Sequence, residues 1–153
     1  MTDKPAVELK VMRLPNLGDL PLPSYATDLS AGMDLFAAIP ENEPVTIQPG
    51  NFALVPSGLA VAIPPGFEVQ IRARSGLCMR HGIFVLNGVG TIDADYRGEM
   101  KIILANFGKE PFTINRGERI GQMVMTRFTS VAWVPVDSLD STSRTGGFGS
   151  TGV

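Results

Sequence analysis

Residues 45–72 read VTIQPGNFALVPSGLAVAIPPGFEVQIR, and this stretch decides the fold class. Short apolar runs alternate in it with turns that contain Pro or Gly, the residues that most often interrupt regular structure. The runs are Val45–Ile47, Phe52–Val55, Leu59–Ile63 and Phe67–Arg72, and the turns between them are Pro49-Gly50, Ser57-Gly58 and Pro64-Pro65-Gly66. Short strands at such intervals are typical of an all-β sandwich, jelly roll or barrel.

The remaining sequence extends the same pattern over the 153 residues. A hydrophobic content of 44%, with 17 Gly and 12 Pro, indicates one folded β domain and excludes a disordered chain. We predict one short helix, over Ser75–His81. Further strands are expected at Val7–Leu14, Ile83–Leu86, Met100–Asn106, Arg119–Phe128 and Trp133–Val136, with Asn115-Arg116-Gly117 as the turn that precedes Arg119.

The net charge of −2 gives no electrostatic reason to expect a nucleic-acid polymer or an anionic membrane as partner, although a local cluster of Arg could hold a small anion. No run approaches eighteen apolar residues, and the N-terminus lacks the pattern of a signal peptide. The single cysteine, Cys78, cannot form an internal disulfide, and one Cys with one His cannot build a zinc site. We therefore expect a cytoplasmic protein in a reducing compartment.

Residues 88–99, GVGTIDADYRGE, place two carboxylates, Asp93 and Asp95, and the aromatic ring of Tyr96 in a glycine-bounded turn. Apolar runs lie on both sides, which predicts a β-hairpin with this loop at its tip. A rigid sheet holds such a loop in position, so it is a suitable place for chemistry. The alternative is an ordinary solvated turn, because Asp and Gly are usual turn residues.

Three other places could hold polar ligands. Asp34 lies inside an apolar run, so its carboxylate either faces water or has dedicated hydrogen-bond donors. The alternative to a functional Asp is a structural one that bonds to nearby backbone. Ser75 is expected to cap the helix, which would make Arg74-Ser75-Gly76 a phosphate-binding site at a helix N-terminus. The alternative is an ordinary capped helix start. Gln122, among apolar residues, either faces a cleft or belongs to a satisfied core network.

From Asp137 the composition changes to Gly, Ser and Thr, which cannot form a core of their own. Residues 146–151, GGFGST, suit close backbone approach to a phosphate chain, with Phe148 able to stack on a flat ring. A disordered terminus is the alternative.

Taken together, five stretches in this order resemble the five ordered motifs of the trimeric dUTPase family. They are Ala31–Ala37 (AGMDLFA), Arg74–Leu77 (RSGL), Gly90–Glu99 (GTIDADYRGE), Gly117–Gln122 (GERIGQ) and the tail Gly146–Gly152. The resemblance extends from about residue 22 to the end of the chain.

The resemblance implies an all-β, jelly-roll-like subunit of the β-clip type over residues 1–136, with one short helix, and a flexible Gly-rich C-terminal arm over residues 137–153. It also implies a homotrimer with shared active sites, in which the arm of one subunit closes a site formed by its neighbours. The implied reaction is hydrolysis of dUTP to dUMP and pyrophosphate with Mg²⁺ as cofactor. That reaction keeps uracil out of DNA and supplies dUMP for dTMP synthesis.

The resemblance also assigns roles around the loop at 88–99. Asp93 matches the general base, whose water attacks the α-phosphorus. Tyr96 matches the tyrosine that packs against C2′ of the deoxyribose, where a ribose hydroxyl would clash. The groups that match the uracil-reading hairpin are Asn87, Lys101 and the backbone of Gly88–Ile92, including Thr91 and Ile92.

The other motifs match residues that contact the phosphates. Gln122 matches a Gln that contacts the phosphates or their ordered water, and Asp34 matches an Asp near the water shell of the metal. No direct protein ligand for the metal is expected. The motif-two phosphate contacts are Arg74, Ser75 and Gly76.

In the arm, Phe148 matches the residue that stacks over uracil, followed by Gly149, and Ser150 and Thr151 match the contacts to the γ-phosphate. Arg144 departs from the family pattern, because it precedes Phe148 by four residues where the family usually has five. The resemblance implies a contact of Arg144 with the γ-phosphate across this shorter spacing.

Two other functions fit the same motifs in part. A dCTP deaminase, or a bifunctional deaminase–diphosphatase, would need a proton-shuttling acid beside the cytosine amine, whereas the hairpin and the Gly-Gly-Phe-Gly arm are of the diphosphatase type. A catalytically silent trimeric nucleotide-binding regulator would not need to keep both Asp93 and the arm.

Overall fold

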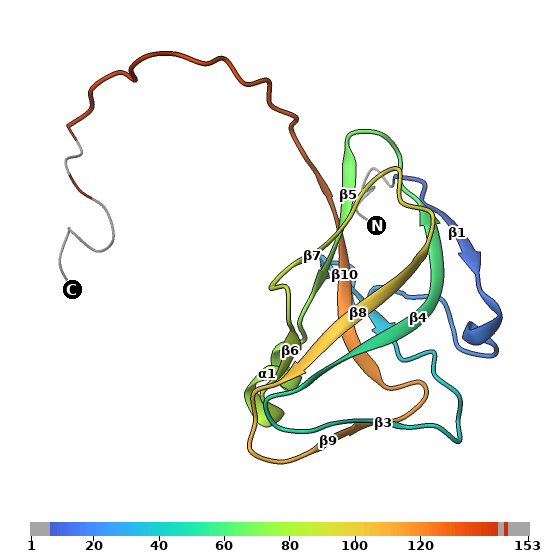
Figure 1. The fold of residues 1–153 in the computed structure, drawn as a ribbon. Coiled ribbons are helices and arrows are strands. Elements are labelled where there is room, and N and C mark those ends of the chain that lie inside the picture. The colour runs from blue at the N-terminus through green and yellow to red at the C-terminus, as the bar shows by residue number, and fades with distance from the viewer. Residues whose placement is uncertain (1–6, 144–145, 147–153) are drawn as a thin grey trace.

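Two antiparallel four-stranded sheets form the body of the protein in a computed structural model, which describes residues 7–143 and 146 (Figure 1). One sheet has the order β1-β4-β8-β6, the other the order β2-β10-β5-β7, and β3 pairs with β9. The bounds are β1 Lys10–Arg13, β2 Met33–Phe36, β3 Val45–Ile47, β4 Phe52–Ala62, β5 Phe67–Arg72, β6 Ile83–Val85, β7 Gly90–Ile92, β8 Glu99–Asn106, β9 Phe112–Ile114 and β10 Arg119–Arg127.

The described residues form one α-helix, α1 (Ser75–His81), and a 3₁₀ turn, η1 (Pro15–Leu17). The predicted all-β, jelly-roll-like fold with one short helix is therefore confirmed. In this part of the chain, no helix is long and apolar enough to cross a membrane.

The core lies between the sheets and follows from period-two alternation along the strands. In β8, Met100, Ile102 and Leu104 are each at most 1% exposed, whereas Lys101 between them is exposed. Val69 and Ile71 of β5 are buried in the same way. Successive side chains on a strand point to opposite faces, so each sheet buries one face and leaves the other for polar groups.

β4 differs from the prediction, because the two strands expected at Phe52–Val55 and Leu59–Ile63 are one strand. The register against β8 shifts between Pro56 and Ala60, so Ser57-Gly58 forms a bulge and not a reversal of the chain. Within the bulge, Ser57 Oγ donates to the Met100 carbonyl at 2.6 Å. Residues typical of turns are also typical of bulges, and the sequence pattern does not distinguish the two.

Three further predictions of strands need correction. β6 and β8 pair as the expected hairpin would, but β7 between them crosses to the other sheet and pairs with β5. β1 is shorter than Val7–Leu14, because β4 offers it only four partners. Trp133–Val136 is not a strand: after β10 the chain leaves the body, where no neighbouring strand pairs with it (Figure 1).

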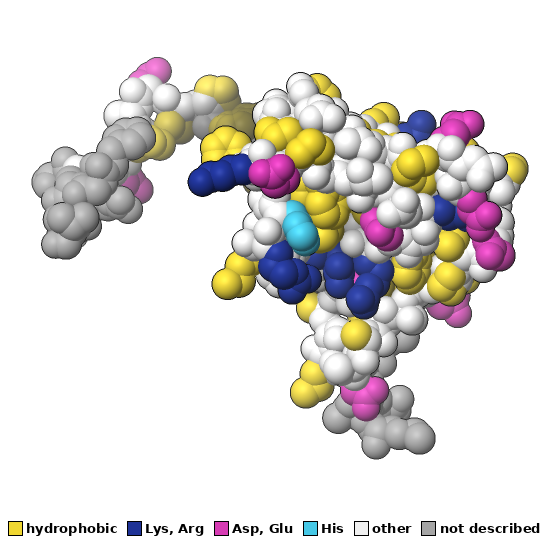
Figure 2. Space-filling model, turned by 90° about the horizontal axis from the view of Figure 1, so that it is seen from below, with side chains coloured by type: hydrophobic (Ala, Val, Ile, Leu, Met, Phe, Trp, Pro, Cys, Tyr) yellow, Lys and Arg dark blue, Asp and Glu magenta, His cyan; other side chains and the backbone are white. Residues whose placement is uncertain are grey.

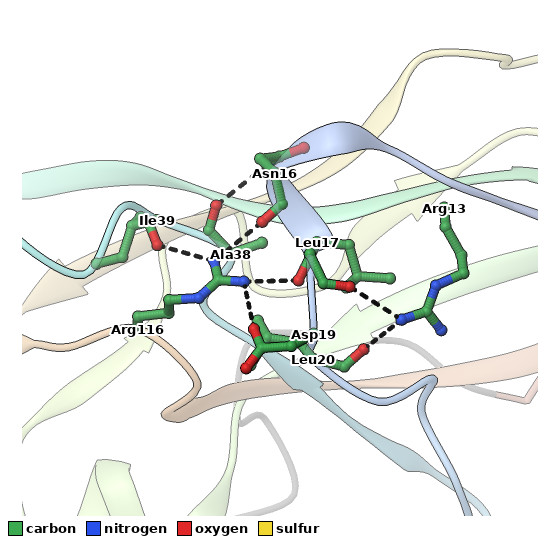
Figure 3. Close-up of polar contacts among 9 residues, drawn as sticks. Arg13, Asn16, Leu17, Asp19, Leu20, Ala38, Ile39 and Arg116 are labelled. Atoms are coloured by element: carbon green, nitrogen blue, oxygen red, sulfur yellow. Dashed lines mark hydrogen bonds and ion pairs between the residues drawn. The ribbon is translucent and has the colours of Figure 1, made fainter.

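Arg116, in the turn between β9 and β10, holds three distant segments together (Figure 3). Its Nη1 donates to the carbonyls of Asn16 and Ile39, both at 3.0 Å, and its Nη2 donates to the Leu17 carbonyl at 2.7 Å. Nη2 also reaches Asp19 Oδ1 at 3.1 Å, and this hydrogen bond lowers the pKa of Asp19 below its ordinary value of 3.8.

We expect Arg116→Gln to lower the free energy of unfolding by about 2–3 kcal/mol, because several carbonyls lose a charged donor. Asp19→Asn is the matched control: Asp19 is exposed and its loss leaves the three carbonyl contacts in place. Since the pKa of Asp19 is lowered on folding, its contribution is present above about pH 4 and is lost as the pH falls through the folded value. Urea unfolding at neutral and acidic pH measures both effects, and equal losses in the two variants would contradict the role of Arg116.

Candidate functional site

β10 lies between β2 and β5, and this pairing brings predicted site residues from three motifs together. Gln122 on β10 is the register partner of Asp34 on β2 and of Arg72 on β5. Two residues after Arg72 comes Arg74, where α1 begins. We call this group, Asp34, Arg74, Arg119 and Gln122, the arginine corner.

Asp34 has the dedicated donors that its place in an apolar run requires. Its Oδ1 accepts from Arg74 Nε at 2.9 Å, and its Oδ2 accepts from Arg119 Nη1 at 3.3 Å. Its side chain is 28% exposed. The carboxylate therefore orients two guanidinium groups at the surface, and both arginines keep further donors for an anion.

Arg119 is a site residue that sequence reasoning missed, although it lies within the fourth quoted motif. The feature that reveals it is the register of β10 against β2. A bulge between Arg119 and Gly121 in the β10–β2 pairing leaves Arg119 opposite Phe36, yet its long side chain reaches Asp34.

Gln122 lies on β10, an interior strand of its sheet, and its side chain is partly buried. Its Nε2 donates to the Ala73 carbonyl at 3.0 Å, while its Oε1 lies against Gly32 so closely that a side chain there would collide with it. The amide is thus held beside the start of α1. Gln122 is therefore a fixed polar group within the arginine corner, and its contact with phosphates or their water stays a prediction.

The start of α1 differs from the prediction in one detail. Ser75 is the first helical residue, Arg74 occupies the N-cap position, and no side chain caps the helix. Ser75 is exposed, and its hydroxyl does not cap the helix. At the other end the helix stops at Gly82, with a φ of 68°, and Leu77 packs against the core.

Figure 2 shows the face of the molecule on which α1 lies. Lys and Arg side chains gather there beside the single His of the chain, His81. The chain as a whole has a net charge of −2, so this face concentrates positive charge against the overall balance. Such a local surplus attracts a small polyanion.

The second group of predicted residues lies in the connection between β7 and β8. Asp93 follows β7 directly and is exposed, and its carboxylate has no partner among the described residues. The Tyr96 amide closes the turn on the Asp93 carbonyl at 3.1 Å, and the Tyr96 hydroxyl donates to the Glu99 carbonyl at 3.0 Å. Gly98 touches the Tyr96 ring so closely that any side chain there would displace it. The turn therefore fixes the ring of Tyr96 and leaves Asp93 free.

Of the predicted uracil-reading groups, Thr91 and Ile92 lie on β7 and Lys101 on β8, whereas Asn87 lies in the connection between β6 and β7. Asn87 and Thr91 are exposed, Thr91 in β7 opposite Gln70 of β5. Ile92 packs against the core, so only its backbone is available. Lys101 on β8 is half-exposed, with its Nζ 3.8 Å from Glu99 Oε2.

Within one copy of the chain, Asp93 and the arginine corner lie at opposite ends of β5. Ile92 pairs with Val69, whereas Arg74 follows the other end of the strand. The run from Val69 to Arg74 spans about 16 Å at about 3.3 Å per residue. Figure 1 shows the same separation: the connection from β7 to β8 lies at the upper end of the body and α1 at the lower end. A single phosphate cannot touch both groups in one copy.

The predicted arm residues Arg144, Phe148, Gly149 and Ser150 lie outside the described residues. Among the described residues, no group of three or more His, Cys, Asp or Glu side chains could hold a metal ion. Both oxygens of Asp34 already accept from arginine. The donor set therefore suits a magnesium ion that arrives with a triphosphate and its water, not one held by the protein alone.

These features describe an all-β protein with two arginines held by Asp34 at its surface and an exposed carboxylate, Asp93, in a separate turn. Comparison with known proteins then identifies the family. The dUTPase family model matches residues 19–152, and the chain belongs to the dUTPase family.

A similar relative is the deoxyuridine 5′-triphosphate nucleotidohydrolase of Maricaulis maris (strain MCS10), 52% identical over 148 residues, which are 96% of this chain and 97% of the relative. Among solved structures, the chain is similar to the dUTPase of Staphylococcus bacteriophage 80alpha with dUPNHPP, with a TM-score of 0.82 and 26% identity over 97% of this chain and 100% of the other. A mutant dUTPase from phage phi11 of S. aureus, which coordinates a structural Mg(II) ion, has a TM-score of 0.75 over 86% and 98% of the chains; at 23% identity it shows the fold alone.

Proposed function

We propose that the chain hydrolyses dUTP to dUMP and pyrophosphate, by attack of water on the α-phosphorus. The single observation that carries this proposal is the family match over residues 19–152, which includes the turn of Asp93. The reaction removes dUTP before uracil enters DNA and provides dUMP for dTMP synthesis.

Asp93 is the general base in this proposal. Its exposed carboxylate has no donor among the described residues, so it is available to accept the proton of an attacking water. A positioned base of this kind is typically worth about 10²–10⁴ in rate. The turn closed by Tyr96 and Glu99 supports its position, because a fixed backbone holds the carboxylate without using its oxygens.

The arginine corner binds the phosphates. Arg74 is oriented by Asp34, and the Ser75 hydroxyl and Gly76 backbone lie next to it, where negative charge develops on the leaving diphosphate. Gln122 borders this group and contacts the phosphates or their water. Mg²⁺, bound by the triphosphate and with Asp34 near its water shell, neutralises phosphate charge.

Two features give selectivity. Paired backbone groups of β7, with Asn87 and Lys101, read the hydrogen-bonding pattern of uracil, and cytosine would leave them unpaired. The Tyr96 ring, held by its hydroxyl and by Gly98, packs against C2′ and excludes a ribose hydroxyl.

The proposed active form is a homotrimer whose sites are shared between subunits. The separation of Asp93 from Arg74 in one copy supports this, because a second copy is needed to complete a site. The segment that follows β10 supports it as well. It exposes a run of large apolar side chains that the body of the same copy does not cover: Val131, Trp133, Val134, Val136 and Leu139.

Two finer points complete the proposal. Residues 137–153 form an arm that closes the site of a neighbouring subunit, with Phe148 over uracil and Arg144, Gly149 and Ser150 at the phosphates. The protein works in the cytoplasm, which the single free cysteine, Cys78, supports.

Pyrophosphate release from dUTP, dCTP, dTTP and UTP, measured in parallel with Mg²⁺, tests the reaction and its selectivity. We expect release from dUTP only, because the hairpin selects uracil and Tyr96 selects deoxyribose. Release from dCTP would instead indicate the deaminase-related function. Tight binding of dUTP without release would indicate a silent nucleotide-binding protein.

Asp93→Asn tests the general base. We expect kcat for dUTP to fall by about 10²–10⁴ or more while the affinity for dUTP is largely kept, because the amide is isosteric but cannot accept the proton. Asp95→Asn is the matched control, since it removes an equal charge from the same turn. Normal turnover by Asp93→Asn in steady-state assays would show that the proposed mechanism is wrong.

Trp133 provides a spectroscopic test of the oligomer, because it is the single Trp of the chain and is 91% exposed in one copy. If the segment packs on a neighbouring subunit, Trp133 fluorescence should be protected from acrylamide at working concentration and become accessible on dissociation. Sedimentation should then give the mass of a trimer. A monomeric mass with a fully quenchable Trp133 would exclude the shared site.

A further inference from the structure

Arg80 lies one helical turn after Gly76 on α1, and its guanidinium group folds back over that glycine. An atom at the Cβ position of Gly76 would lie 3.0 Å from Nη2 and 3.4 Å from Cζ of Arg80. Residues four apart on a helix share a face, and helical side chains lean toward the preceding turn. The charge of Arg80 therefore lies against the Arg74-Ser75-Gly76 stretch.

Nothing in the described part of the chain neutralises this charge. Arg80 has no hydrogen-bond or ion-pair partner among the described residues, whereas Arg74 and Arg119 share the carboxylate of Asp34. Three guanidinium groups and one carboxylate leave two positive charges on these four side chains, in a chain with a net charge of −2. An exposed arginine with free donors at such a place is ready to bind an anion bidentately.

We propose that Arg80 is a further phosphate-binding residue, which binds the β,γ-diphosphate of the substrate and stabilises it as it leaves; this rests on the proposed hydrolysis of dUTP. The attacking water and the leaving group lie on opposite sides of the α-phosphorus. Asp93 activates the water on one side of the α-phosphorus, so cations on α1, beside Ser75 and Gly76, contact the diphosphate on the other side. The P–O bond to the diphosphate breaks as the bond from water forms, and negative charge passes to the group that Arg80 contacts.

The position of Arg80 on the helix distinguishes it from Arg144. Arg144 belongs to the arm, where its spacing to Phe148 departs from the family pattern. Arg80 is carried by a helix that packs on the core through Leu77. It can therefore bind the diphosphate before the arm closes, and without any change in the register of the arm.

Calorimetric titration of the full chain with pyrophosphate and with dUMP, together with steady-state kinetics on dUTP, all with Mg²⁺, tests this role. For Arg80→Gln we expect the Kd of pyrophosphate and the KM of dUTP to rise about tenfold or more, because a charge-assisted hydrogen bond is lost. The Kd of dUMP should not change, since dUMP lacks the β- and γ-phosphates. Arg80→Lys should recover part of the loss, because it keeps the charge but not the planar fork.

Lys109→Gln is the matched control, because it removes the same charge from an exposed residue of the neighbouring loop. It should leave all three affinities unchanged, and circular dichroism should show that each variant is folded. Unchanged pyrophosphate and dUTP affinities in Arg80→Gln, or an equal loss for dUMP, would overturn the proposal. Pyrophosphate binding does not require turnover. A parent protein that binds pyrophosphate through Arg80 but releases none from dUTP would therefore contradict the proposed hydrolysis and still support Arg80.

Discussion

The antiparallel pairing of β10 with both β2 and β5 is the constraint on which the site depends. It places Gln122 in register with Asp34 on one side and Arg72 on the other, so that residues far apart in the sequence share one row across the sheet. The row ends where α1 begins, and Asp34 can then hold Arg74 and Arg119 at the same time. A slip of one residue would turn this row into the core, because side chains alternate between the two faces of a sheet.

The pairing of β5 with β7 separates residues instead of bringing them together, because the two strands run antiparallel. Gly90 lies at the end of β5 near the arginine corner, while Ile92, and therefore Asp93, lies toward the other end. The sheet that assembles the proposed phosphate-binding residues thus keeps Asp93, the proposed base, away from them. This separation is the geometric argument for the proposed shared site, in which a second copy would present Asp93 to a phosphate bound at the arginine corner.

The sequence allowed the fold class and the helix to be predicted, because both depend on local spacing; the site residues were named from motifs, and their roles stay predictions. Long-range register was not predictable from it. The ion pair of Arg119 with Asp34 and the crossing of β7 to the other sheet both depend on which strands pair, and alternation is the same for either partner. The bulge at Ser57-Gly58 was mistaken for a turn for a related reason: a Gly with positive φ suits both.

Glu99 shows how the fold and the base-bearing turn are connected. It lies in the third motif, two residues after Arg97, and its Oε1 accepts from the Gly58 amide in the β4 bulge and from Asn16 Nδ2, both at 2.8 Å. The Asn16 carbonyl in turn accepts from Arg116. One side of the Asp93 turn is therefore fixed to the bulge and, through Asn16, to the Arg116 cluster. Because the Tyr96 hydroxyl donates to the Glu99 carbonyl, this structural acid also helps to determine where the Tyr96 ring lies. Glu99, the first residue of β8, therefore holds one end of the turn in place, while the carboxylate of Asp93 stays free for its proposed role.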